Sequence, residues 1–176
     1  MNALSRDSFV RTLVQERGYS RLGQGTRAVA LAHPRFPDRV VRVALYDRAN
    51  PTADKAPEDG WLHYMERFGT SRSRHVPKVY SITLYAEFYV VEMERLERIP
   101  FDLWNKSGLH EAYYCGLDSE LSDHRVGGSI RTLYRRILAE GAELGSRGGP
   151  DLHEDNFMLR GDTIVATDPF YMRRAA

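Results

Sequence analysis

The densest group of reactive side chains lies in the sequence Asp-Leu-His-Glu-Asp-Asn at residues 151–156, called the acidic loop below. Its first and last members, Asp151 and Asn156, are followed by Asp168 at the end of a short apolar stretch. Carboxylate and amide oxygens are hard ligands of the kind that Mg²⁺ takes, together with phosphate oxygens and waters. These three residues predict a magnesium site, and the alternative is a solvated loop in which Asn and Asp only form turns. His153 is expected to brace the loop through a hydrogen bond rather than to bind metal.

The elements that must hold this loop lie in the second half of the chain. Residues 100–120 are aromatic and are predicted to be irregular. Apolar residues recur at helical spacing over residues 129–144 and predict the best-defined helix of the chain. Glycine and proline fill most of residues 145–150 and predict a loop. Residues 157–160 and 163–167 then read as two short strands around a glycine turn.

The first half of the chain reads mainly as β-strand. Residues 9–17 have the spacing of an amphipathic helix, which Gly18 would end. Residues 19–46 alternate strands with turns and predict a three-stranded meander. Residues 60–68 place large apolar side chains on one helix face, and residues 76–96 read as a hairpin. The first half is therefore predicted to hold about five strands and one inserted helix.

Length, composition and charge restrict the class of protein. A chain of 176 residues with 42% hydrophobic and 28% charged residues predicts one globular domain. The formal net charge of +1 excludes binding of nucleic acid or anionic lipid through net charge. The single cysteine, Cys115, leaves no internal disulfide, and its spacing from His110 and His124 does not favour a zinc site. No stretch has the length and hydropathy of a membrane span or a secretory signal, so we expect a cytoplasmic protein without membrane or nucleic-acid partners.

Four segments, taken in chain order, resemble the protein-kinase-like superfamily. Asp151 and Asn156 have the spacing of its catalytic loop, Asp-x-x-x-x-Asn, and residues 168–170 stand where its metal-binding triplet is found. Residues 22–29 resemble its glycine-rich loop. Residues 90–96 resemble the strand that leads into its adenine-binding hinge. The Asp-Leu-His form of the catalytic loop is similar to that of aminoglycoside phosphotransferases and lipopolysaccharide kinases.

The resemblance implies that the chain binds ATP and Mg²⁺, and it assigns roles in phosphoryl transfer. Asn156 and Asp168 would hold Mg²⁺, and Asp151 would accept or orient the proton of a serine or threonine hydroxyl. Backbone amides of the glycine-rich loop would cover the phosphates, because residues without a Cβ let the main chain approach closely. Backbone groups at the hinge would meet adenine, with Met93 behind it. The residues implied at the nucleotide are Gly23, Gly25, Thr26, Arg42, Glu94 and Leu96.

Two positions depart from the pattern of the superfamily. Arg42 stands where the phosphate-binding lysine is found, and the exchange is not conservative because the guanidinium is larger and planar. The alternative for Arg42 is a strand residue at the surface with its stem on the sheet. Its acidic partner would be Glu66 or Glu58. In residues 168–170, Asp-Pro-Phe, the proline fixes one backbone dihedral and is predicted to stiffen the metal-binding segment.

Within the superfamily, residues 19–170 resemble the kinase domain of the early serine/threonine protein kinases of T-odd bacteriophages. The similar segments are residues 22–45, residues 75–82, residues 151–159 and the closing Thr-Asp-Pro. Proteins of that family phosphorylate host proteins early in infection and help to shut off host transcription. The resemblance implies the kinase domain alone, without the basic C-terminal extension of that family. Because 176 − 168 leaves eight residues after Asp168, we also expect no activation segment and none of the large helical lobe that docks a peptide substrate.

The predicted fold class is α+β, a minimal protein-kinase-like fold. Its β-rich N-lobe with one helix would cover about residues 1–96, and a truncated, mainly helical C-lobe would cover residues 97–176. The resemblance implies an ATP- and Mg²⁺-dependent serine/threonine kinase in the cytoplasm of the infected bacterial host, acting on host proteins or on itself. The first alternative is a catalytically impaired kinase fold that binds and inhibits a host protein, such as RNA polymerase or a defence factor. A small-molecule phosphotransferase is the second alternative, and a homo-oligomer is left open.

Overall fold

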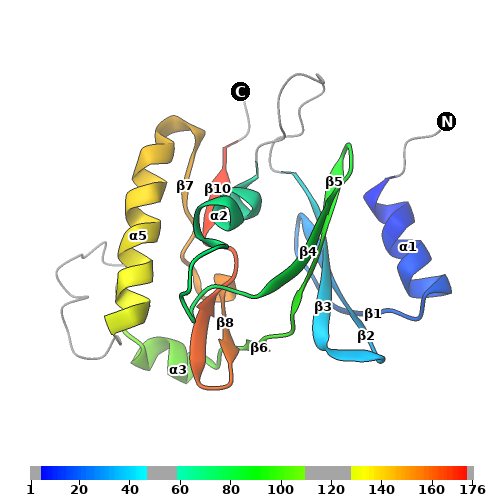
Figure 1. Cartoon of the computed structure of the whole chain (residues 1–176), viewed down its shortest axis with the longest axis horizontal. Coiled ribbons are helices and arrows are strands. Elements are labelled where there is room, and N and C mark those ends of the chain that lie inside the picture. Colours follow the sequence, from blue (N-terminus) through cyan, green and yellow to red (C-terminus); the bar gives the residue numbers. More distant parts are fainter. Residues whose placement is uncertain (1–4, 47–58, 110–127, 174–176) are drawn as a thin grey trace. The chain divides into compact units, whose positions relative to one another are not determined.

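The computed structural model describes residues 5–46, 59–109 and 128–173 (Figure 1). The chain divides into two compact units, each with its own hydrophobic core. The first unit consists of Met1–Asp59 and Lys78–Arg95, and the second unit consists of Gly60–Pro77 and Leu96–Ala176.

A five-stranded antiparallel sheet forms the first unit, with the strand order β1-β2-β3-β5-β4. Its strands are β1 (Ser20–Gln24), β2 (Ala28–His33), β3 (Phe36–Leu45), β4 (Val79–Leu84) and β5 (Phe88–Glu94). The β-branched residues that fill β3 and β5 favour extended backbone and pack well on a pleated surface. The structure confirms the predicted meander and the hairpin that follows it.

Helix α1 (Arg6–Glu16) covers one face of this sheet. The Ser5 hydroxyl caps its N-terminus by accepting a hydrogen bond from the N–H of Ser8 over 3.3 Å. Gly18 follows the helix with a φ of 73°, a left-handed conformation that favours glycine. The predicted helix and its end are therefore confirmed. The buried core between helix and sheet consists of Val10, Val29, Leu31, Val43 and Phe88.

The second unit combines helices with short strands. Its helices are α2 (Gly60–Phe68), α3 (Phe101–Lys106) and α5 (Gly128–Leu144), with 3-10 turns at Gly145–Arg147 and Glu154–Asn156. Its strands are β6 (Glu97–Arg98), β7 (Gly148–Pro150), β8 (Phe157–Arg160), β9 (Thr163–Ala166) and β10 (Phe170–Met172). Strands β6, β8 and β9 form one antiparallel sheet, and β7 pairs with β10 in another. Helix α5 and the β8–β9 hairpin are confirmed as predicted, and the α+β class holds for the described chain.

Helix α2 packs inside the second unit. The sequence pattern predicts it instead as the inserted helix of the β-rich first half. Tyr64 and Phe68 are buried in the core of the second unit beside Phe170 of β10. The Tyr64 hydroxyl donates to the carbonyl oxygen of Ala166 over 3.0 Å. Gly60 lies so close to the carbonyl oxygen of Phe170 that a Cβ would collide with it. These partners lie about a hundred residues away in sequence, so helical spacing alone does not indicate them.

Two local predictions for the second unit are wrong. Residues 101–106 form α3 where irregular structure was expected, because buried Trp104 anchors a helix too short to show clear periodicity. Residues 148–150 pair as strand β7 rather than forming loop only, because the absence of side chains at Gly148 and Gly149 lets Tyr171 of β10 approach closely. None of the helices in the described ranges is long and apolar enough to cross a membrane.

Candidate active site

Hydrogen bonds within the second unit join both ends of the acidic loop to the residues on either side of Asp168. The N–H of Asp151 donates to the carbonyl oxygen of Pro169 over 2.8 Å. The carbonyl oxygen of Asn156 accepts from the N–H of Thr167 over 2.7 Å and from the Thr167 hydroxyl over 3.0 Å. We call these three hydrogen bonds the bracket. The bracket holds the acidic loop against Asp168, which is the proximity that the spacing of these residues predicted.

The side chain of Asn156 is oriented by the acidic loop itself. Asn156 is 8% exposed, and its Nδ2 donates to the carbonyl oxygen of Asp151 over 2.7 Å. This bond leaves Oδ1 as the acceptor atom of the amide. Among the described residues, no group of three or more His, Cys, Asp or Glu side chains is placed to hold a metal. Asn156 and Asp168 carry amide and carboxylate oxygens, which are donors that Mg²⁺ accepts together with the oxygens of a phosphate or water.

The carboxylate of Asp151 is partly open to solvent. Its side chain is 37% exposed, and its Oδ1 lies 3.6 Å from Nε2 of His153. This distance is too long for a hydrogen bond, so the expectation that His153 braces the loop through one is wrong. The Asn156 amide and the bracket brace the loop instead. Asp151 is therefore accessible to an acceptor hydroxyl.

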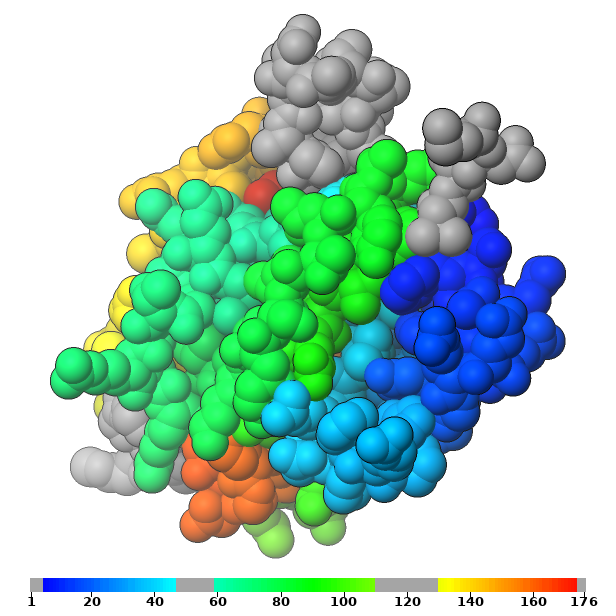
Figure 2. Space-filling model, turned by 45° about the vertical axis from the view of Figure 1, so that its right-hand side comes forward, coloured from blue at the N-terminus to red at the C-terminus, as the bar shows by residue number. Residues whose placement is uncertain are grey.

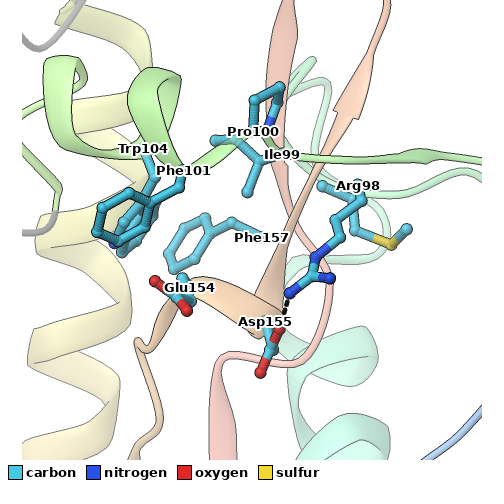
Figure 3. A pocket seen from close by; sticks show the side chains of 9 residues that line it. Arg98, Ile99, Pro100, Phe101, Trp104, Glu154, Asp155 and Phe157 are labelled. Carbon is cyan, nitrogen blue, oxygen red and sulfur yellow. Dashed lines mark ion pairs between the residues drawn. The ribbon is translucent and has the colours of Figure 1, made fainter.

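A pocket of about 580 Å³ lies beside the acidic loop in the second unit (Figure 3). One wall comes from the chain after Leu96, including Trp104 of α3, and another comes from Phe157 of β8. The rings of Trp104 and Phe157 are buried, and their centroids lie 4.9 Å apart. Arg98 and Asp155 lie at its edge with their charged atoms 3.6 Å apart, and their exposure makes this ion pair weak. The pocket therefore has apolar walls and a charged rim.

Sequence reasoning missed this pocket. Its aromatic residues belong to the segment that was predicted to be irregular and to the strand that follows the acidic loop. The one signal present was the spacing of Phe101 and Trp104, three residues apart, which is that of a helix face.

The glycine turn in the first unit connects β1 to β2. The N–H of Gly25 donates to the carbonyl oxygen of Ala28 over 2.9 Å and closes the turn, and Thr26 is exposed. Neither Gly23 nor Gly25 has a positive φ. Within the described residues a Cβ at Gly23 would meet nothing within 4 Å, and one at Gly25 would meet only the oxygen of Ala28 at 3.9 Å. Neither conformation nor crowding in the fold therefore requires glycine at these two positions.

Arg42 lies in the middle of the sheet and faces away from α1. Val41 and Val43 pack into the core below α1, so alternation turns the Arg42 side chain to the other face. There it is paired across the strands with Ala30 of β2 and Val91 of β5, and it is half-buried. This half-buried position also agrees with the alternative for Arg42, a strand residue at the surface with its stem on the sheet.

The face of the sheet that carries Arg42 also carries a buried carboxylate. Tyr89 lies on this face, and its hydroxyl donates to Oδ1 of Asp59 over 2.8 Å. Asp59 is 5% exposed. Burial raises the pKa of Tyr46, and the negative charge of Asp59 raises it further. The sheet face that carries Arg42 therefore also has a buried acidic side chain bound to Tyr89.

The structure describes only one of the two glutamates that were expected to pair with Arg42. Glu66 lies on the exposed side of α2, and Glu58 lies outside the described residues. Asp59, the residue after Glu58, was not considered as a partner. The sequence signal for it was only its place directly before the predicted helix, which is typical of a helix cap rather than of a buried acid.

The strand end expected to meet adenine is fixed by hydrogen bonds in the first unit. The N–H of Glu94 donates to the carbonyl oxygen of Lys78 over 3.0 Å, and Oε1 of Glu94 accepts from the N–H of Lys78 over 2.7 Å. The N–H of Arg95 donates to the carbonyl oxygen of Asp38 over 2.8 Å. The buried side chain of Glu94 thus fixes the end of β5 to Lys78. A contact with adenine stays a prediction for the backbone of Glu94 and Leu96.

Comparisons with known proteins give little guidance. No family model matches the sequence, and no curated protein matches it. Solved structures do match, and one of them is a co-crystal structure of WbdD and the kinase inhibitor LY294002. The match has 16% sequence identity and a TM-score of 0.38, and it covers 85% of this chain and 32% of the other. This chain thus spans about a third of that protein's length, and the similarity is too distant for an inference about function.

Proposed function

We propose that the chain is a kinase-like phosphotransferase, which binds ATP with Mg²⁺ and transfers the terminal phosphoryl group to a serine or threonine hydroxyl of a protein. The bracket supports this proposal most directly. It joins the backbone segments that carry Asp151, Asn156 and Asp168, the residues to which we assign proton transfer and metal binding. Phosphoryl transfer needs both groups close together, since one positions the acceptor and the other neutralises the phosphates through a metal ion.

In the proposed reaction Asp151 orients the acceptor hydroxyl and takes its proton. The hydroxyl oxygen bonds to the terminal phosphorus, while the bond from that phosphorus to the oxygen bridging it to the next phosphate breaks. Mg²⁺, when bound, neutralises charge on the phosphate oxygens. Asn156 and Asp168 would hold the ion.

Residues of the first unit would bind the rest of the phosphate chain. Amides of the turn at Gly23, Gly25 and Thr26 would contact the phosphates, which explains glycine at two positions where the fold does not require it. Arg42 would add a positive charge with two forked donors. Backbone groups of Glu94 and Leu96 would meet adenine, as the sequence resemblance implies.

We extend the proposal to the targets that the sequence resemblance implies. The acceptor would be a host protein or the chain itself, in the cytoplasm of an infected bacterium. The test is transfer of labelled phosphate from ATP to the chain and to a host extract. Asp151→Asn should lower the rate by about 10²–10⁴ while leaving ATP binding unchanged, because proton transfer contributes about that much.

Asp162→Asn is the matched control, since Asp162 lies in the exposed turn between β8 and β9, where its carboxylate accepts a hydrogen bond from the Thr163 hydroxyl. It should keep the wild-type rate. Equal transfer by wild type and Asp151→Asn would refute the proposed activity. Transfer to a hydroxylated small molecule but not to protein would instead favour the small-molecule phosphotransferase.

A second candidate function is a kinase fold without turnover that binds and inhibits a host protein, such as RNA polymerase or a defence factor. Arg42 favours it, because a guanidinium differs in shape from the ammonium expected at this position. Asp168→Ala should remove use of Mg²⁺ and ATP. If the effect of the chain on host growth survives this substitution, binding rather than catalysis is the function.

A further inference from the structure

A second cavity, of about 420 Å³, lies in the first unit between α1 and the edge strand β1. We call it the arginine cleft. Helix α1 and β1 both lie at the surface of this unit (Figure 2, blue). The cleft is on the α1 side of the sheet, because Val10 and Val29, which belong to the core under α1, form its floor. Arg42 faces the other side of the sheet, whereas Gln24 and Val29 of the cleft lining belong to the turn segment that we assign to the nucleotide phosphates.

Positive charge is concentrated in the arginine cleft. Three of its lining residues are arginines, Arg6, Arg11 and Arg21, and its one acidic lining residue is Asp7. Two amide side chains, those of Gln15 and Gln24, add neutral hydrogen-bonding groups. The formal balance of the lining is therefore 3 − 1 = +2, in a chain whose total is +1.

Two of these guanidinium groups donate hydrogen bonds to neighbouring groups. Arg6 is only 14% exposed, and its Nη1 donates to the carbonyl oxygen of Arg27 over 3.1 Å. Its Nη2 lies 2.8 Å from Oδ1 of Asp7. Nη1 of Arg21 donates to Oε1 of Gln24 over 3.0 Å. Arg6 is thus held in position before any ligand binds, which lowers the entropy cost of binding, whereas Arg21 and Gln24 are both exposed.

The third guanidinium is available to a ligand. Arg11 is exposed, and its guanidinium makes no hydrogen bond or ion pair with the residues that the structure describes. It lies one helical turn after Asp7, so it faces the same side of α1. The cleft therefore combines one held guanidinium group, that of Arg6, with two exposed ones that can contact an anion.

We infer that the arginine cleft binds a phosphate monoester. A monoester carries about −1.5 to −2 charge at pH 7 and three acceptor oxygens, which matches a lining of net charge +2 built from forked donors. A single carboxylate would leave one positive charge uncompensated. The cavity is larger than a phosphate group alone, so it also has room for the group that carries the phosphate. The carrier is a small molecule or the side chain of a phosphorylated peptide, and this inference does not depend on the proposed kinase activity.

Isothermal titration calorimetry of the full chain tests this inference. The probes are O-phosphoserine, a phosphoserine peptide, the same peptide without phosphate, and a short single-stranded oligonucleotide. We expect saturable binding of the phosphorylated probes with a Kd of about 1 mM or tighter. The double variant Arg11→Gln and Arg21→Gln should weaken it by about tenfold or more.

The matched control is the double variant Arg17→Gln and Arg35→Gln, which removes two exposed arginines of the same unit outside the cleft. It should bind like wild type, and circular dichroism should show all variants folded. Tighter binding of the phosphopeptide than of O-phosphoserine identifies a protein carrier, and equal binding identifies a small-molecule carrier. Three results would overturn the inference: no binding at about 10 mM probe, unchanged binding by the cleft variant, or tighter binding of the oligonucleotide or unphosphorylated peptide.

Discussion

The substitution Thr167→Val removes one hydrogen bond from the bracket and keeps the shape of the side chain. Thr167 is 7% exposed, and its hydroxyl donates to the carbonyl oxygen of Asn156 over 3.0 Å. That oxygen keeps its second donor, the N–H of Thr167, so it is not left without a partner. The loss of one buried hydrogen bond should lower the free energy of unfolding by about 1 kcal/mol. For a chain of this length the melting temperature should fall by about 2–4 °C.

Urea unfolding and thermal melting measure this effect, with Thr163→Val as the matched control. The Thr163 hydroxyl donates to Oδ1 of Asp162 over 3.3 Å in an exposed turn, so its loss should cost less than about 0.5 kcal/mol. If Thr167→Val lowers the free energy of unfolding no more than Thr163→Val does, the bracket does not stabilise the fold.

A second measurement separates stability from positioning. Mg²⁺ with ATP should raise the melting temperature of wild type, because a ligand that binds only the folded state stabilises it. The rise should be smaller for Thr167→Val, since the bracket holds Asn156, which we assign to the metal ion. An equal rise in both proteins would refute the claim that the bracket positions Asn156 for the metal.

Three further substitutions test other parts of the structure. The double variant Gly23→Ala and Gly25→Ala should fold with unchanged or slightly higher stability, because alanine loses less entropy on folding and fits the space. It should weaken binding of Mg²⁺ and ATP in the same melting assay, and loss of the fold would contradict the open geometry of the turn. Burial raises the pKa of Tyr46 most, and the negative charge of Asp59 raises it further. Asp59→Asn removes this charge, so the pKa of Tyr46 should fall towards its ordinary value in an absorbance titration. An unchanged titration would show that Asp59 does not act on Tyr46. Burial lowers the pKa of His75, so the unfolded chain takes up its proton first as the pH falls. The free energy of unfolding should therefore fall as the pH drops below about 6.5, and less steeply in His75→Gln, whereas equal slopes would exclude a contribution from His75.

Local patterns predicted those parts of the fold that depend on neighbouring residues. Alternation in β3 and the spacing of Leu133 and Ile137 in α5 come from the periods of strand and helix, which the sequence carries directly. The unit to which α2 belongs depends instead on Phe170, a contact distant in sequence. Strand β7 was missed because Gly148 and Gly149 have no side chains that could alternate.

In the candidate site, too, local patterns predicted some features, whereas others depend on packing between distant residues. The spacing of Asp151, Asn156 and Asp168 predicted their proximity. The hydrogen bonds of Thr167 that produce it were not predicted, because a threonine at a strand end has many uses. The buried position of Asp59 depends on packing around Tyr89, and no local pattern reports such packing.

The bracket also determines how the acidic loop and the Asp168 segment open. The N–H groups of Asp151 and Thr167 are both donors in it, and they belong to the two segments that it joins. Local opening of either segment exposes both, so these amides should exchange with solvent deuterium at a common rate, as members of one cooperative unit. A substitution that moves one segment will therefore move the other. The proposed proton acceptor, Asp151, and the proposed metal ligands, Asn156 and Asp168, should therefore change position only together, although they are separated in the sequence.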